Sequence, residues 1–323
     1  MPEFTRRSAV AGLAAFIVRP AFAETPWPSR PLTLLQGYAP GGPTDTVARL
    51  VADGLSKRLG QQVIVDSKPG AAGTIAAAQL AKAAPDGYTL MIIPGGHATT
   101  AALYKKLPYR AVDDFSMISM IADYPFVFVT HSDHAIKSAG DLIALSRAKD
   151  TPLLYGTPGI GSIHHLAVEL FAREAGIHLN HIPYRGTSQV VTDLIGKRLD
   201  FMIDAPTLVL QMVQSGQLRA FAVSGSSRFF ALPDVPTVSD SALPGYVVTS
   251  WQSVMGPSGI APAIVARLNR EIAEFVAEPD TVNRLRTFGS EPAPSSPEAL
   301  KARLIADIEK WAGVIDAANI ERI

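Results

Sequence analysis

The sequence predicts an α/β fold in two lobes, each a mostly parallel β-sheet flanked by helices. The chain has 323 residues, of which 47% are hydrophobic, and this length exceeds what one compact domain usually holds. Short apolar runs alternate with longer segments of helical periodicity, as in the βαβ units that build parallel sheets. The alternation occurs in two separate series, so we expect one sheet in each of two lobes.

The first series is ordered strand, helix, strand, helix, strand. Its first helix begins behind a glycine-proline turn, and Val47, Leu50 and Leu55 recur in it at the spacing of one helical face. The predicted elements are a strand at 32–35, a helix at 44–59, a strand at 63–65, a helix at 74–82 and a strand at 89–93.

The second series begins near residue 130. Its predicted elements are a helix at 138–148, a strand at 153–156, a helix at 162–175, a strand at 181–182, a helix at 188–195, a strand at 201–204, a helix at 207–215 and a strand at 218–223. A short strand at 247–251 and three helices follow, the last capped by Ser296 with Pro297 in its first turn. The expected lobe 1 comprises 24–128 and 249–323, and the expected lobe 2 comprises 129–248.

The first 23 residues have the zones of an export signal. Arg6 and Arg7 precede an apolar run over 9–18, and the segment 21–23, Ala-Phe-Ala, is a small-x-small cleavage pattern. The run is shorter than the roughly 20 residues that a transmembrane helix needs. We therefore predict a signal peptide at 1–23 and a periplasmic protein, exported by the Sec or the twin-arginine route. The alternative, an ordinary N-terminal helix, requires these zones to arise by chance.

Charge and composition narrow the function classes. The chain carries 29 basic and 29 acidic residues, and removal of the signal peptide leaves 26 and 28. Such a nearly neutral chain has no strong field that would attract nucleic acid or anionic lipid. The absence of cysteine excludes disulfides and thiolate metal sites. We expect no cofactor, no metal ion and no nucleic-acid partner, and we expect a monomer.

A glycine-rich turn between the first strand and the first helix is the most informative segment. Such a turn exposes unpaired N–H groups at the positive end of the helix dipole, which favours an anion. Its spacing matches neither a dinucleotide fingerprint nor a P-loop, so a nucleotide is not expected. The plain alternative is a tight turn whose aspartate only favours the first helical turn. The candidate ligand-binding residues here are Tyr38, Ala39, Pro40, Gly41, Gly42 and Asp45.

Three further segments follow later strands. The segment 157–164 is a second strand-to-helix glycine turn, in the other lobe, and 95–100 is expected to be a loop that offers hydroxyls and an imidazole. Two glycine turns that face each other across a cleft could each hold one end of a small acid. Asp204 ends a predicted strand, and three roles stay open for it: an acceptor for a ligand, a buried general base, or a strand-end residue with only structural hydrogen bonds. The candidates are Gly95, His97, Thr157, Gly161, Ser162, His164 and Asp204.

Six segments together resemble one known family. They are YAPGGPTDTVARL (38–50), SKPGAAG (67–73), APDGYTL (84–90), LPY (107–109), IPYRG (182–186) and LPDVPTV (232–238). In this order and spacing they are similar to the Bug family, the substrate-binding proteins of tripartite tricarboxylate transporters. The resemblance implies a type II periplasmic binding-protein fold that closes on its ligand, and membrane transporter subunits as transient partners.

The resemblance also implies a ligand site. The ligand carboxylate would meet the loop at 38–42 with Asp45, and the opposite lobe would contribute the turn at 157–164 and Asp204. The chain departs from the family where Tyr38 replaces the Phe of many relatives and where the second turn lacks a Ser-x-Gly-x-x-Ser pattern. The expected ligand is a small carboxylate, a di- or tricarboxylate or a related organic acid.

Two other function classes stay open at this point. A secreted α/β enzyme that acts on a carboxylated substrate needs a nucleophile or a metal, yet the sequence has no G-x-S-x-G elbow and no H-E-x-x-H motif. His164 and His165 are neighbours on a predicted helix and point about 100° apart, so they do not form a paired metal site. We therefore expect no enzyme. A sensor module for a membrane receptor would use the same cleft.

Overall fold

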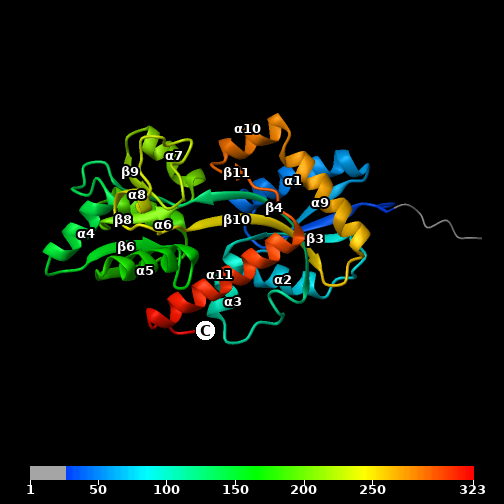
Figure 1. The fold of residues 1–323 in the computed structure, drawn as a ribbon, viewed down its shortest axis with the longest axis horizontal. Helices are drawn as coiled ribbons and strands as arrows, with labels where there is room; N and C mark the ends of the chain where they lie inside the picture. Colours follow the sequence, from blue (N-terminus) through cyan, green and yellow to red (C-terminus); the bar gives the residue numbers. More distant parts are fainter. Residues whose placement is uncertain (1–26) are drawn as a thin grey trace, which may run out of the picture.

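The computed structural model describes residues 27–323, and the predicted signal peptide at 1–23 lies outside the described residues. The described chain forms two lobes that lie side by side along the long axis of the molecule (Figure 1). Each lobe is built on its own β-sheet, and the chain passes between the lobes more than once. The predicted two-lobed α/β fold is confirmed.

The helices and strands follow the predicted order closely. Lobe 1 contains β1 (Leu32–Gln36), α1 (Pro43–Leu59), β2 (Val63–Ser67), η1 (Ala71–Gly73), α2 (Thr74–Ala81), β3 (Thr89–Pro94), α3 (Gly96–Leu103) and β4 (Phe115–Pro125), and then, after the return of the chain, β10 (Thr249–Pro257), α9 (Pro262–Val276), α10 (Pro279–Thr287), β11 (Glu291–Pro292) and α11 (Pro297–Ala317). Lobe 2 contains β5 (Val127–His131), α4 (Ala139–Ala148), β6 (Leu153–Thr157), α5 (Ile163–Ala175), β7 (Leu179–Pro183), α6 (Thr187–Ile195), β8 (Phe201–Asp204), α7 (Pro206–Gln214), β9 (Leu218–Val223) and α8 (Val238–Ser241).

Helix α1 shows why these residues form these elements. Pro43 occupies its first turn, where a missing N–H costs nothing, and Gly60 ends it in the left-handed conformation at φ 70°. Val47, Val51 and Leu55 lie on one face and are almost fully buried against the sheet. Local signals therefore set both ends of this helix, and burial of its apolar face holds it in place.

Both sheets are mixed: in each, most strands run in the same direction and antiparallel strands are inserted among or beside them. The strand order is β11-β4-β10-β3-β1-β2 in lobe 1 and β7-β6-β8-β5-β9 in lobe 2. Strands β1, β2 and β3 are parallel, as are β6, β7 and β8, but β10 is antiparallel to both of its neighbours and β5 is antiparallel to β8 and β9. The physical reason is that β4 carries the chain out of lobe 1 and β10 carries it back, so the two strands run in opposite directions.

Strands β4 and β5 and helix α3 are absent from the sequence prediction. The segment that we expected to be a loop at 95–100 is mostly the first part of α3. The hydroxyls of Thr99 and Thr100 donate to the Gly96 carbonyl oxygen at 2.9 and 3.0 Å, which satisfies them inside the helix. Threonine in a helix can bond to the preceding turn in this way, so its low helix propensity did not decide the outcome here.

Ser224 joins the two segments of chain that cross between the lobes. Its hydroxyl accepts from the Phe126 N–H at 2.8 Å and donates to the Val248 carbonyl oxygen. Its backbone N–H donates to the Phe126 carbonyl oxygen, and its own carbonyl accepts from Val248 N–H. Ser224 is fully buried. The two crossings are therefore tied together at one point.

Helix α11 lies along one side of the molecule and packs on α3 and β4 of lobe 1 and on α5 of lobe 2 (Figure 1). As predicted, Ser296 caps it, because its hydroxyl accepts from the Ala299 N–H. Trp311 and Ile315 of this helix are buried in a core cluster that includes residues of both lobes. Within 27–323, none of the helices has the length and apolar character needed to cross a membrane.

Candidate functional site

A cavity of about 300 Å³ lies between the two lobes. Lobe 1 contributes Tyr38 from the turn after β1, the η1 turn and one side of α3, and lobe 2 contributes the glycine-rich turn after β6 and the start of α5. The lining residues are Tyr38, Ala72, Gly96, Thr99, Thr100, Leu103, Tyr104, Pro158, Gly159, Ile160, Gly161, Ser162, Ile163, His164 and Ile323. Of the candidates from the sequence, Tyr38, Gly161, Ser162 and His164 meet here.

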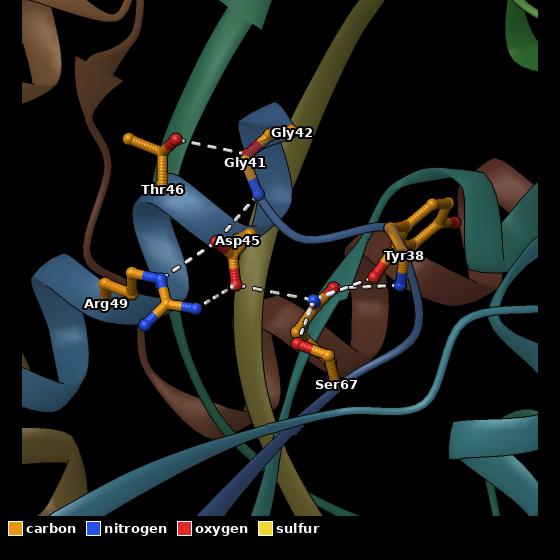
Figure 2. Close-up of polar contacts among 8 residues, drawn as sticks. Tyr38, Gly41, Gly42, Asp45, Thr46, Arg49 and Ser67 are labelled. Carbon is orange, nitrogen blue, oxygen red and sulfur yellow. Dashed lines mark hydrogen bonds and ion pairs between the residues drawn. The ribbon is translucent and has the colours of Figure 1, made fainter.

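Gln36, at the end of β1, positions Tyr38 in the cavity wall. The buried Gln36 amide accepts from the Tyr38 N–H and donates to the Tyr38 carbonyl oxygen, both at 2.8 Å, and also bonds to the Ser67 hydroxyl (Figure 2). The Tyr38 hydroxyl donates to the Ala72 carbonyl oxygen at 3.3 Å. Burial raises the pKa of this phenol, so Tyr38 presents a neutral ring to the cavity.

The turn after Tyr38 satisfies its own amides. The Gly41 N–H donates to the Asp45 carboxylate at 2.9 Å, and Arg49 donates to the same carboxylate (Figure 2). The Gly42 N–H donates to the Ala39 carbonyl oxygen at 3.3 Å. The Arg49 guanidinium, together with the Gly41 amide, lowers the pKa of Asp45.

This arrangement resembles the plain alternative for that turn more than an open anion site. Asp45 is buried and serves the turn itself. Tyr38 lines the cavity, but the other candidates of this turn, Ala39, Pro40, Gly41, Gly42 and Asp45, do not. Ligand contact therefore stays a prediction for Ala39, Pro40, Gly41, Gly42 and Asp45.

The second glycine-rich turn is held from behind by two histidines. The Gly161 N–H donates to Nδ1 of His165 at 3.1 Å, and the Thr157 hydroxyl lies 2.6 Å from Nε2 of His181. The two imidazole rings stack with their centroids 3.9 Å apart. Burial lowers the pKa of His165 to about 3 and that of His181 to about 4. Both rings are therefore neutral near pH 7, which leaves Nδ1 of His165 free to accept.

Ser162 and Thr157 complete the same turn. The Ser162 hydroxyl donates to the Gly159 carbonyl oxygen at 2.8 Å and caps α5 by accepting from the His165 N–H. The Thr157 hydroxyl also accepts from the Gly159 N–H at 3.3 Å. Thr157 itself is fully buried and does not line the cavity, so its role in this structure is to shape the turn.

His164 and Asp204 form a pair at the inner edge of the cavity. His164 Nε2 lies 3.5 Å from Asp204 Oδ1, and the imidazole packs edge-on against Phe126. Asp204 Oδ1 also accepts from the Ala205 N–H at 2.7 Å. His164 Nδ1 and Asp204 Oδ2 are buried and have no hydrogen-bond partner among the described residues. Asp204 itself does not line the cavity, so ligand contact stays a prediction for it.

Gly95 and His97 do not line the cavity, which corrects the expectation of a polar loop there. The Gly95 N–H donates to the Trp251 carbonyl oxygen. The His97 ring stacks on Tyr109, and its Nε2 lies 3.0 Å from the Ala111 carbonyl oxygen. Burial lowers the pKa of this imidazole. His97 is a core residue because the helical turn of α3 points it away from the cleft.

Sequence reasoning missed the side of α3 that does face the cavity. Thr99 and Leu103 are four residues apart and line it together with Thr100, as expected of neighbours on one helical face. The available signal was this spacing, which becomes visible only when 96–103 is assigned to a helix. Ile160 in the second turn was also missed, although it is a large apolar side chain between two glycines.

A family model described as the tripartite tricarboxylate transporter family receptor matches residues 47–320. The chain belongs to this family. The family is one of receptors, and the resemblance to the Bug proteins is confirmed by this match together with the similarity to BugT of Bordetella pertussis and to BugD.

Three solved structures are similar along nearly the whole chain. The periplasmic binding protein BugD is 32% identical with a TM-score of 0.78, over 91% of this chain and 99% of BugD. Rpa4515 of R. palustris, solved with adipate, is 34% identical with a TM-score of 0.82, over 92% and 100%. MatC of Rhodopseudomonas palustris, with bound malate, is 30% identical with a TM-score of 0.76, over 90% and 100%. This protein is a solute-binding protein of the periplasmic class.

Proposed function

We propose that this receptor captures a small organic acid in the cavity between its lobes and delivers it to a membrane transporter of the tripartite tricarboxylate type. The observation that carries the proposal is the position of the cavity between the first residues of two helices, Gly96 of α3 and Ile163 of α5, one from each lobe. The N-terminal end of a helix favours an anion. The acids bound by Rpa4515 and MatC support the same ligand class.

Calorimetry with a diacid and its monoamide tests the proposal. Two carboxylates would each meet one helix N-terminus, so adipate should bind more tightly than its monoamide. A hydrogen bond to a charged group is worth roughly 1.5 to 3 kcal/mol, which corresponds to a loss of about ten- to a hundredfold in affinity. Equal affinities would mean that one carboxylate suffices. No heat with any small acid would contradict the proposal itself.

Delivery to a transporter is tested in cells. Deletion of the gene should abolish uptake of the bound acid, and the gene carried on a plasmid should restore it. A sensor module would instead alter gene expression and leave uptake intact. We also propose a periplasmic monomer whose first 23 residues are removed, so the protein recovered from the periplasm should begin at Glu24 by mass spectrometry.

A further inference from the structure

We infer that the ligand is an acid with an apolar body and one or two carboxylates, and that the cavity discriminates against polyhydroxylated acids and tricarboxylates. The inference rests on the proposed function and narrows it to a substrate class. Three independent properties of the cavity carry it: the apolar side chains in its wall, the engagement of its hydroxyl groups and the small positive charge that it offers.

The wall is largely apolar and comes from both lobes. Leu103 of α3 lines the cavity from lobe 1 and Ile160 and Ile163 line it from lobe 2, and the rings of Tyr38 and Tyr104 add to the same surface. Ile160 is 60% exposed, although it lies within a cavity wall and not on a convex surface. A ligand with an apolar body would cover this side chain. Each methylene that is buried in such contact improves affinity by about fourfold.

Four of the hydroxyl groups in the wall already donate their hydrogen atoms within the protein. Thr99 and Thr100 donate to the Gly96 carbonyl oxygen, and Ser162 donates to the Gly159 carbonyl oxygen. Tyr38 donates to the Ala72 carbonyl oxygen. These four side chains can accept but not donate. Ligand hydroxyls that lie against the apolar side chains of Leu103, Ile160 and Ile163 would lose their water without gaining a partner, which opposes binding.

The cavity offers little positive charge to compensate the carboxylates of a ligand. Among the described residues that line it, none is Lys, Arg, Asp or Glu. The N-termini of α3 and α5 each act as roughly half an elementary charge, so together they supply about one positive charge. Asp204 lies behind His164 at 3.5 Å and adds no positive charge. A third carboxylate would therefore enter without a compensating group.

Two matched pairs of acids test the inference by calorimetry on the full mature protein. Galactarate is adipate with a hydroxyl on each inner carbon, and tricarballylate is glutarate with a third carboxylate. Adipate should bind at least tenfold more tightly than galactarate, and glutarate at least tenfold more tightly than tricarballylate. Terephthalate extends the panel to an aromatic body.

The outcomes separate the inference from the proposed function. Galactarate or tricarballylate binding as tightly as its matched acid would overturn the inference and leave the proposed function standing. Failure of every acid in the panel to bind would overturn both.

A variant of Ile160 locates the discrimination in the cavity. Ile160→Thr should weaken adipate binding about three- to tenfold and should change galactarate binding much less, so the ratio of the two affinities narrows. The matched control is Ile195→Thr on α6 of the same lobe, where the side chain is 42% exposed and lies outside the cavity. An unchanged ratio in Ile160→Thr would overturn the assignment of the apolar wall.

Discussion

At the scale of single residues, one close approach between the lobes in the cavity wall depends on a glycine. Gly161 has φ 71°, and a Cβ atom built there would lie 2.2 Å from Cδ2 of Leu103 in the opposite lobe. Only glycine allows both the left-handed backbone and this approach. The turn thus combines a conformational requirement with a packing requirement at one position.

Gly161→Ala should reduce affinity for adipate at least tenfold, because the added methyl group pushes Leu103 and the opposite lobe away. Gly176→Ala separates the two requirements, since Gly176 has φ 61° but no atom within 4 Å of the position of its Cβ. This control should lose stability without losing affinity. The double variant Gly161→Ala with Leu103→Ala should recover part of the affinity. Calorimetry measures all three, and equal loss in the Gly176 variant would contradict the packing argument.

The lowered pKa of His165 makes the stability of the folded protein depend on pH. This pKa is about 3 in the folded protein because of burial, whereas an unfolded histidine has a pKa of about 6.5. Between these values the unfolded state binds the additional proton, so the folded state loses stability as the pH falls below about 6.5. The loss attributable to this residue is about 1.4 kcal/mol per pH unit within that window.

Urea unfolding at pH 7, 6 and 5 checks this expectation. His165→Gln removes the titrating group. The difference in unfolding free energy between wild type and variant should therefore change by about 1.4 kcal/mol per pH unit, the effect of one bound proton. His178→Gln is the control, because His178 is exposed. Parallel pH profiles for wild type and His165→Gln would show that the imidazole is not held neutral.

At the scale of elements, the two lobes are connected through the strands that lead the chain from one lobe to the other. β4 and β10 pair antiparallel along their length in lobe 1, from Thr249 opposite Pro125 to Pro257 opposite Phe115. Beyond that ladder, Ser224 at the end of β9 bonds to both crossings. The connection therefore consists of the backbone hydrogen bonds of the β4–β10 pair and one buried hydroxyl, which hold the two crossing segments next to each other.

Ser224→Ala should destabilise the protein by about 1 to 3 kcal/mol, because the buried Phe126 N–H and the Val248 carbonyl oxygen each lose the hydrogen bond to the hydroxyl. Ser215→Ala is the matched control, since that hydroxyl bonds at the exposed end of α7. Unfolding in urea gives both values. A Ser224 variant as stable as the control would mean that water replaces the hydroxyl at the crossing.

At the scale of the whole molecule, the two-lobed arrangement places the cavity where a change of lobe orientation would open it. The walls come from different lobes, and the chain joins them through two crossings near Phe126 and Val248. We expect ligand to close the lobes about these crossings. The radius of gyration from small-angle scattering should therefore decrease when adipate saturates the protein, and identical profiles with and without adipate would contradict closure.

The sequence by itself determined the family and the order of most elements, although not β4, β5 and α3. Periodicity and end signals act within a few residues, so the first strand, helix α1 after its glycine-proline turn and the Ser296 cap of α11 were predictable. The motifs after β1 and β6 also marked the two turns that lie nearest the cavity. Tyr38 and Gly161 were found in this way because strand ends in α/β sheets meet at one edge.

Tertiary structure decided the direction of the strands and the side chains that face the cavity. β10 is antiparallel to β4 because the chain must return from lobe 2, and no local pattern records that return. His97 and Thr99 lie in the same short helix, yet one packs on Tyr109 and the other lines the cavity. Which of the two faces the ligand depends on how the helix packs, and that is set by contacts between segments far apart in the chain.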